Sequence, residues 1–256
     1  MNASPSDREA GKELATSAKE ALVSQLERVR RLHESRQSSA ELAAALDRLA
    51  FWQARRLDAT YADLARDPRY AEAIAFFGSD LYGPGDFSRR DADLARVVPI
   101  MARVLPEGVI ETVGRAMELS ALSQELDRTL LDKLGVEVEL SVPAYCAAYR
   151  ACANRRFRER QIGLIVEVGQ ALDRYVHTPL LRRTLSLMRR PARIAGLGAL
   201  QHFLERGFTS FAGMRGADHF LATIEARETE LMDAIFSGNR SPFPDPMSGA
   251  GGRERS

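Results

Sequence analysis

Apolar residues recur every three or four positions along nearly the whole chain, which is the spacing that places side chains on one face of an α-helix. In residues 7–36 this face carries Leu14, Ala18, Leu22, Leu26 and Val29. In residues 40–66 it carries Leu46, Leu49, Gln53, Leu57, Tyr61 and Leu64. The pattern predicts amphipathic helices, each of which buries one side.

Prolines, glycines and capping residues divide the rest of the chain into further helices. Asp67 is a good N-cap and Pro68 fits a first helical turn, so a third helix begins there. Later helices are predicted at residues 89–105, 106–134, 143–176 and 179–189, from Pro191 to 211, and at 221–235. Gly135 is the expected end of the helix at 106–134. Residues 136–140 alternate like a strand, but no partner strand exists, and we interpret them as a loop.

Seven to nine helices with short connections predict an all-α protein, a single multi-helix bundle with little or no β-structure. Residues 40–236 contain no long polar linker and are expected to form this domain. Residues 1–39 are expected to form a partly frayed N-terminal helix. Residues 237–256 are rich in Gly, Pro and Ser and are expected to be disordered.

One block, FFGSDLYGPGDFSRRD at residues 76–91, concentrates aromatic, glycine and charged residues. A structural elbow between two helices accounts for most of it, because Gly83 and Pro84 end one helix and Ser88 can cap the next. Two arginines in the first turn of that next helix oppose its dipole and require a carboxylate partner or an external anion. The candidate charged site or elbow therefore comprises Asp80, Tyr82, Asp86, Arg89, Arg90 and Asp91.

The same block resembles a motif of the form FFxxxLYGPxDFxxRD found in a family of uncharacterised bacterial helical proteins. The similarity extends along residues 45–236 and includes the segment FLERGFTSF. The motif positions in this chain are Phe76, Phe77, Leu81, Tyr82, Gly83, Asp86, Phe87, Arg90 and Asp91. The resemblance implies an all-helical bacterial protein. It implies no mechanism, because the family has no assigned activity.

Charge is distributed unevenly along the chain. The formal net charge is only +1, which predicts no general attraction to nucleic acid or membranes. Residues 150–193, however, contain eleven arginines and three acidic residues. This segment either binds phosphates or pairs with the acidic remainder, within the chain or across a dimer. The candidate anion-binding residues are Arg155, Arg156, Arg160, Arg182 and Arg183.

No compact motif for catalysis, metal binding or cofactor binding is present in the sequence. The G-x-S-x-G, P-loop, HExxH and dinucleotide patterns are missing, as are the Glu-x-x-His pairs of di-iron bundles. His177 could ligate a haem, but a histidine at a helix end is commonly a cap. Cys146 and Cys152 point in different directions on one predicted helix, so neither a disulfide nor a zinc site is expected. We therefore expect no metal and no cofactor.

Location and function follow from these absences as expectations. No apolar run reaches the roughly 20 residues that span a bilayer, and the N-terminus lacks the order of a signal peptide, so a cytoplasmic protein without a membrane partner is expected. The favoured function is non-enzymatic, through a protein partner or a homodimer. One alternative is anion or nucleic-acid binding through residues 150–193, although no helix-turn-helix or RNA-binding motif supports it. A third is an all-α enzyme or small-ligand carrier with a pocket beside the aromatic block.

Overall fold

The computed structural model describes residues 5–81, 93, 96–97, 106–137 and 139–248. All regular structure in these residues is helical and they contain no strand, which confirms the predicted all-α class. Within the same ranges, no helix combines the length and the apolar character that crossing a membrane requires. The helices are α1 (Pro5–Gln37), α2 (Ala40–Thr60), α3 (Ala62–Arg66), α4 (Ala71–Phe76), the π-helix η1 (Phe77–Leu81), α6 (Glu107–Leu134), α7 (Val142–Ala151), α8 (Arg155–Val176), α9 (Pro179–Ile194), α10 (Gly198–Met214) and α11 (Asp218–Phe236).

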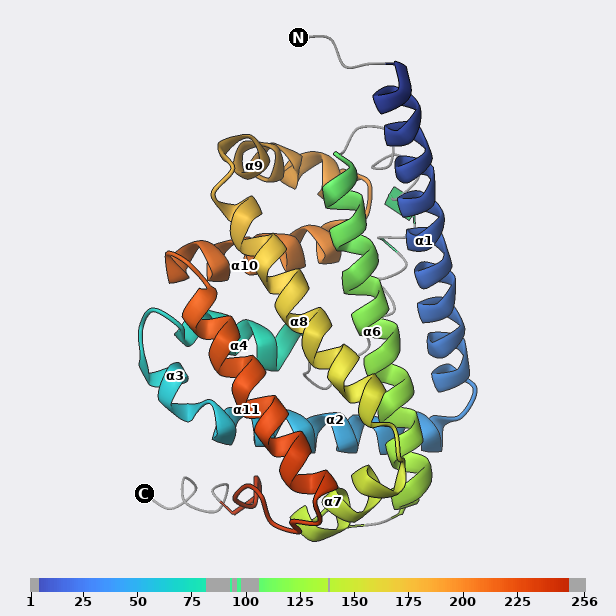
Figure 1. Ribbon diagram of the computed structural model, residues 1–256, viewed down its shortest axis with the longest axis vertical. Coiled ribbons are helices and arrows are strands. Elements are labelled where there is room, and N and C mark those ends of the chain that lie inside the picture. Colours follow the sequence, from blue (N-terminus) through green and yellow to red (C-terminus); the bar gives the residue numbers. More distant parts are fainter. Residues whose placement is uncertain (1–4, 82–92, 94–95, 98–105, 138, 249–256) are drawn as a thin grey trace.

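Four long helices run side by side along the molecule (Figure 1). α1 packs along α6, α6 along α8, and α8 along α11. α2 crosses behind them near the end where α7 lies, and α9 lies toward the opposite end (Figure 1). α10 contacts both α4 and α8. Most of the apolar faces predicted from the periodicity are thereby turned toward one another.

Two aromatic-rich cores form between these helices. The first centres on Trp52, which is 3% exposed and whose ring lies 4.6 Å from that of Tyr145. The second centres on Phe220, which is completely buried and stacks against Tyr70 with the ring centroids 5.8 Å apart. Burial of large rings of this kind supplies much of the hydrophobic driving force for folding. The space between the two cores holds the candidate site.

Two predictions about the early helices are wrong. The helix expected to begin at Asp67 and Pro68 begins at Ala71, without a side-chain cap. The helix expected at 40–66 is divided at Tyr61 into α2 and α3.

Two other helix boundaries with strong local signals lie where the sequence places them. The helix at 106–134 ends at Leu134, and Gly135 follows it with a φ of +86° and donates its N–H to the Leu131 carbonyl. Pro179 occupies the first turn of α9, where its missing N–H has no helical partner to lose.

Two predictions about the later helices are wrong. The helix expected at 143–176 is two helices, because Ala153 adopts a left-handed φ of +50° and Asn154 follows it. Pro191 opens no helix and lies inside α9, while α10 begins at Gly198. Pro191 removes the hydrogen bond to the carbonyl of Leu187. That residue is 77% exposed, so water can satisfy the freed carbonyl and the helix continues.

Residues 237–248 belong to the segment expected to be disordered, and they continue from α11 across the first core. Phe243 is 9% exposed, and its ring lies 5.9 Å from that of Trp52 and 6.2 Å from that of Tyr145. One aromatic residue therefore anchors a stretch that carries no helical period.

Phe243→Ala is expected to lower the free energy of unfolding by about 3 kcal/mol, because it removes a buried ring and leaves a cavity beside Trp52. Urea denaturation measures this change. Met247 is 41% exposed, and Met247→Ala is the control, with an expected change below about 0.5 kcal/mol. Equal effects of the two substitutions on the free energy of unfolding would show that Phe243 stabilises the protein no more than an exposed side chain does.

Candidate functional site

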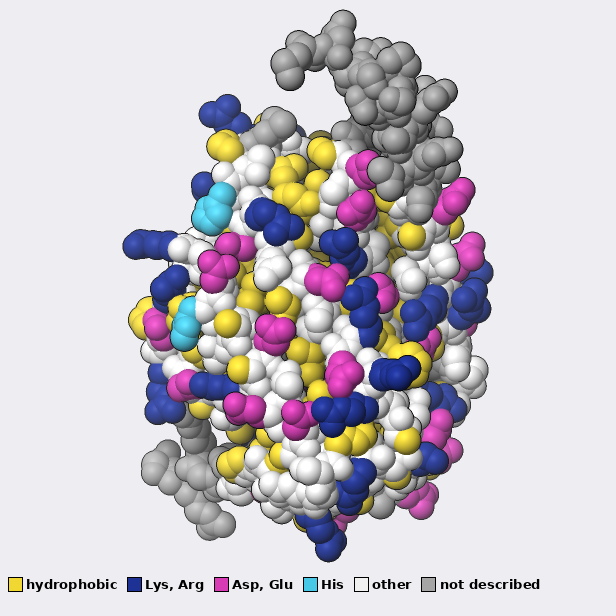
Figure 2. All heavy atoms as spheres, in the orientation of Figure 1, with side chains coloured by type: hydrophobic (Ala, Val, Ile, Leu, Met, Phe, Trp, Pro, Cys, Tyr) yellow, Lys and Arg dark blue, Asp and Glu magenta, His cyan; other side chains and the backbone are white. Residues whose placement is uncertain are grey.

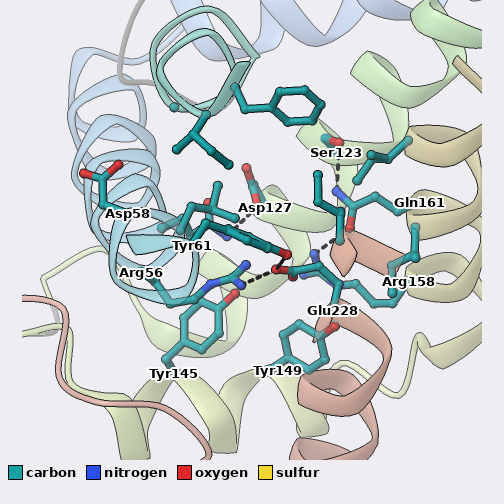
Figure 3. Close-up of a pocket in the computed structure, with 18 residues that line it drawn as sticks. Arg56, Asp58, Tyr61, Ser123, Asp127, Tyr145, Tyr149, Arg158, Gln161 and Glu228 are labelled. Atoms are coloured by element: carbon teal, nitrogen blue, oxygen red, sulfur yellow. Dashed lines mark hydrogen bonds and ion pairs between the residues drawn. The ribbon is translucent and has the colours of Figure 1, made fainter. Parts of the chain in front are cut away.

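A cavity of about 90 Å³ lies between the two cores (Figure 3). Helices α2, α4, η1, α6, α7, α8 and α11 all contribute side chains to its wall. Its apolar lining is formed mainly by Leu57, Ile74, Phe77, Ile162, Ile165 and Ile224. The remaining wall is unusually polar for the interior of a helical bundle, and it contains two arginines, three carboxylates and three tyrosines (Figure 3).

Arg56 and Glu228 form a well-enclosed ion pair at one side of the cavity. Nη1 of Arg56 lies 2.6 Å from Oε1 of Glu228, and the side chains are 13% and 17% exposed. Tyr61 donates its hydroxyl to the same oxygen at 2.8 Å. Burial opposes the charge of Arg56, but the attraction of Glu228 outweighs it, so the pKa of Arg56 is raised. The positive charge of Arg56 is therefore balanced by Glu228 within the protein.

Arg158 differs from Arg56 because it has no carboxylate partner among the described residues. It is 5% exposed, and Cζ lies 4.5 Å from the centre of the Tyr149 ring. Nη1 donates to Oε1 of Gln161 at 3.2 Å, whereas Nε and Nη2 are buried and donate to no described residue. Buried N–H groups of charged side chains are almost always hydrogen-bonded. Arg158 thus has donors at the cavity that the described part of the chain leaves unused.

Asp127 reaches the same cavity from α6 (Figure 3). Its Oδ1 accepts a hydrogen bond of 3.0 Å from Nε2 of Gln53. Burial raises the pKa of Asp127, and the opposing attraction of Arg158 and the bond from Gln53 reduce this effect without cancelling it. Asp127 and Arg158 consequently face one cavity without forming an ion pair.

Tyr145 and Tyr149 line the cavity with uncharged phenol groups. Burial raises the pKa of both Tyr145 and Tyr149, and the nearby guanidinium of Arg158 opposes this only in part. Both phenols therefore stay protonated at neutral pH and can donate hydrogen bonds. Gln161 extends the polar wall further, since its Nε2 donates to Oγ of Ser123 at 2.8 Å.

The block at 76–91 contributes its aromatic start to this site. Phe77 and Gly78 line the cavity. The backbone of Asp80 belongs to η1, but its side chain lies outside the described part of the chain. The other candidate residues of the block also lie outside the described residues, namely Tyr82, Asp86, Arg89, Arg90 and Asp91.

The candidate anion-binding arginines do not come together in one place. Arg155 bonds to Glu159 at 2.9 Å and to Asp233 at 2.5 Å. Nε of Arg160 lies 2.9 Å from Oε1 of Glu118, and its Nη1 lies 2.8 Å from Oε1 of Glu167. The other three are exposed on α8 and α9 and form no ion pair with a described residue, namely Arg156, Arg182 and Arg183.

The cavity residues were not predicted from the sequence. Arg158 was counted only as one of the eleven arginines of residues 150–193. Two signals point to it in retrospect. Gln53 interrupts an apolar helix face, and Arg158 shares a face with Ile162 and Ile165 at the spacing i, i+4, i+7. A polar residue on the buried side of a helix indicates a partner or a ligand inside the protein.

Comparison with known proteins gives a family and no function. No curated protein and no solved structure matches the chain. The sequence model of a domain of unknown function, DUF8198, matches residues 32–242. This range contains every residue that lines the cavity. Because the match covers most of the chain, the protein belongs to the DUF8198 family, whose function is unknown.

Proposed function

We propose that the protein binds a small organic acid in the interior cavity and that Arg158 recognises the acid group. The supporting observation is the pair of buried N–H groups of Arg158, Nε and Nη2, that no described residue accepts. A guanidinium presents such donors as a planar fork that matches the two oxygens of a carboxylate. A bound carboxylate would satisfy both donors and neutralise the buried charge.

The other walls narrow the class of ligand. A volume of about 90 Å³ corresponds to roughly three water molecules at their share of liquid volume, so the ligand must be small. Asp127 offers an acceptor that suits a ligand hydroxyl or amino group, and the isoleucines of α8 and α11 suit a short apolar part. The proposed ligand is therefore a small hydroxy acid or amino acid.

The nucleophilic side chains of α7 are held in their protonated forms, which favours binding over catalysis. Burial raises the pKa of the Cys146 thiol to about 11, so this cysteine is protonated and unreactive at neutral pH. The phenols of Tyr145 and Tyr149 are protonated as well. Action through a protein partner or a second copy, expected from the sequence, stays a prediction.

Calorimetric titration with a panel of small carboxylates tests the proposal, with the primary amide of each acid as the matched control. The acids are expected to bind saturably and the amides at least tenfold more weakly, because only the acids complement Arg158. A ligand at 100 times its dissociation constant should also stabilise the protein by about 2.7 kcal/mol. Equal binding of acids and amides, or no binding by any acid, would refute the proposal.

The affinity for a simple carboxylate without a hydroxyl or amino group is expected to increase as the pH falls. The raised pKa of Asp127 means that this carboxyl takes up its proton at a higher pH than an ordinary aspartate. Protonation removes a negative charge from the cavity and supplies a donor to the bound anion. Calorimetric titrations at several pH values above the pKa of the ligand measure this dependence. The affinity should rise with falling pH in the parent protein and should not depend on pH in Asp127→Asn.

A further inference from the structure

Helix α9 leaves part of its apolar surface without a partner. Leu187 is 77% exposed, Ile194 is 81% exposed and Met188 is 45% exposed. Ala192, on the other side of the helix from Leu187 and Ile194, is buried, and α9 contacts α10 and α8. Exposed aliphatic side chains grouped on one helix mark a surface that meets another apolar phase.

Cations alternate with these aliphatic residues on the same face. Arg183, Leu187, Arg190 and Ile194 follow the spacing i, i+4, i+7, i+11, which keeps them on one side of an α-helix. Arg183 and Arg190 form no ion pair with a described residue, and α9 itself contains no acidic residue. Figure 2 shows cationic and hydrophobic side chains gathered at the end of the molecule where α9 lies.

A shallow groove between α9 and α10 adds a place for anions beside this face. Its lining includes Arg189, Arg190, Arg193 and His202, together with Glu205. Nε of Arg189 lies 2.5 Å from Oε1 of Glu205, so the one carboxylate among the described residues of the groove is already paired. Arg190 and Arg193 are left to bind external anions such as phosphate.

We propose that α9 docks the protein on an anionic phospholipid membrane. Leu187 and Ile194 enter the boundary of the acyl chains, while Arg190 and Arg193 contact lipid phosphates in and beside the groove. A helix that has a basic side and an aliphatic side, and that is polar over most of its length, is suited to lie in this interface without spanning it. The proposal does not depend on the ligand in the interior cavity.

Other partners suit the surface less well. A nucleic acid would neutralise the arginines but would leave Leu187 and Ile194 in water. A second copy docked on the same face would bring together two helices that carry arginines and no acidic residue, and like charges repel. The near-neutral total charge led us to expect no membrane partner, but charge acts locally at an interface because salt screens it beyond about 10 Å.

Co-sedimentation of the full chain with lipid vesicles tests the proposal. We expect binding to vesicles of phosphatidylcholine mixed with phosphatidylglycerol, and at least tenfold weaker binding to phosphatidylcholine alone. The double variant Leu187→Ser with Ile194→Ser should bind at least tenfold more weakly, and so should Arg190→Glu with Arg193→Glu. Circular dichroism of each variant checks that the helical fold is retained.

Matched variants on α8 serve as controls. Phe157 is 59% exposed and Arg156 is exposed without an ion pair to a described residue. Phe157→Ser and Arg156→Glu should each change vesicle binding less than twofold. Vesicle binding that survives loss of both aliphatic residues would overturn the proposal, as would binding to duplex DNA without binding to vesicles. A dimer in solution that Leu187→Ser dissociates would overturn it in favour of a second copy.

Discussion

Arg158→Met should abolish binding of small acids while leaving the protein as stable as the parent or more stable. The substitution removes a guanidinium that is 5% exposed and lacks a described carboxylate partner. Withdrawing an ion from water costs several kcal/mol, whereas the contact with the Tyr149 ring returns about 2 kcal/mol. A methionine of similar length fills the space without that cost, so we expect a gain of about 1 kcal/mol in the free energy of unfolding.

The loss of binding should be large. Two charge-assisted hydrogen bonds are removed, each worth about 1.5–3 kcal/mol, so the dissociation constant should rise at least 100-fold. Calorimetry measures this change, and urea denaturation without ligand measures the change in stability. Arg158→Lys should bind with intermediate affinity, because a lysine keeps the charge and loses the planar fork.

Arg156→Met is the matched control for this experiment. Arg156 lies two residues away on the exposed side of α8. Its substitution should therefore change neither the affinity for small acids nor the free energy of unfolding appreciably. If Arg158→Met instead lowers stability by several kcal/mol and leaves acid binding intact, Arg158 is a structural residue and the proposed function is wrong.

Glu228→Gln should have the largest effect on stability among the cavity residues. It leaves Arg56 enclosed without its counter-charge, in a pair whose side chains are only 13% and 17% exposed. Removing one partner of a buried ion pair costs about 3–5 kcal/mol. We expect the free energy of unfolding to fall by about 3 kcal/mol, at the lower end of this range. Glutamine keeps the shape of the side chain and can still accept a hydrogen bond from the hydroxyl of Tyr61. Urea denaturation at neutral pH checks this value.

Two further variants separate charge from packing. Combining Arg56→Met with Glu228→Leu should recover most of the lost stability, since an apolar pair of similar volume avoids the cost of burying charges. Glu159→Gln removes one of the two carboxylate partners of Arg155 in an exposed pair, and should lower the stability far less than Glu228→Gln. An equal cost for Glu228→Gln and Glu159→Gln would mean that the enclosed pair contributes no more than a surface pair.

The two arginines of the cavity are thus expected to respond in opposite ways. Arg56 is held by Glu228 within the protein, and breaking that pair destabilises the fold. Arg158 has donors that the described part of the protein leaves unused, and removing it affects the ligand. This contrast is what distinguishes a binding residue from a structural residue in the same cavity.

The sequence by itself determined the helical class and many helix ends. Periodicity and caps act over three or four residues, so Gly135 and Pro179 could be placed without knowing the fold. The break at Ala153 could not be placed in this way. Residues 151–156 contain neither glycine nor proline, so the left-handed turn there depends on how α7 and α8 pack in the bundle.

The cavity was decided only by the tertiary structure. Its ion pair joins Arg56 to Glu228 across 172 residues of sequence, and Asp127 and Arg158 come from two further helices. In the sequence, only its place on the apolar face of Ile162 and Ile165 sets Arg158 apart from the other arginines of residues 150–193. Its unused donors arise because packing against Tyr149 removes it from water without supplying a carboxylate. Burial of that kind is a property of assembled helices, and no local pattern encodes it.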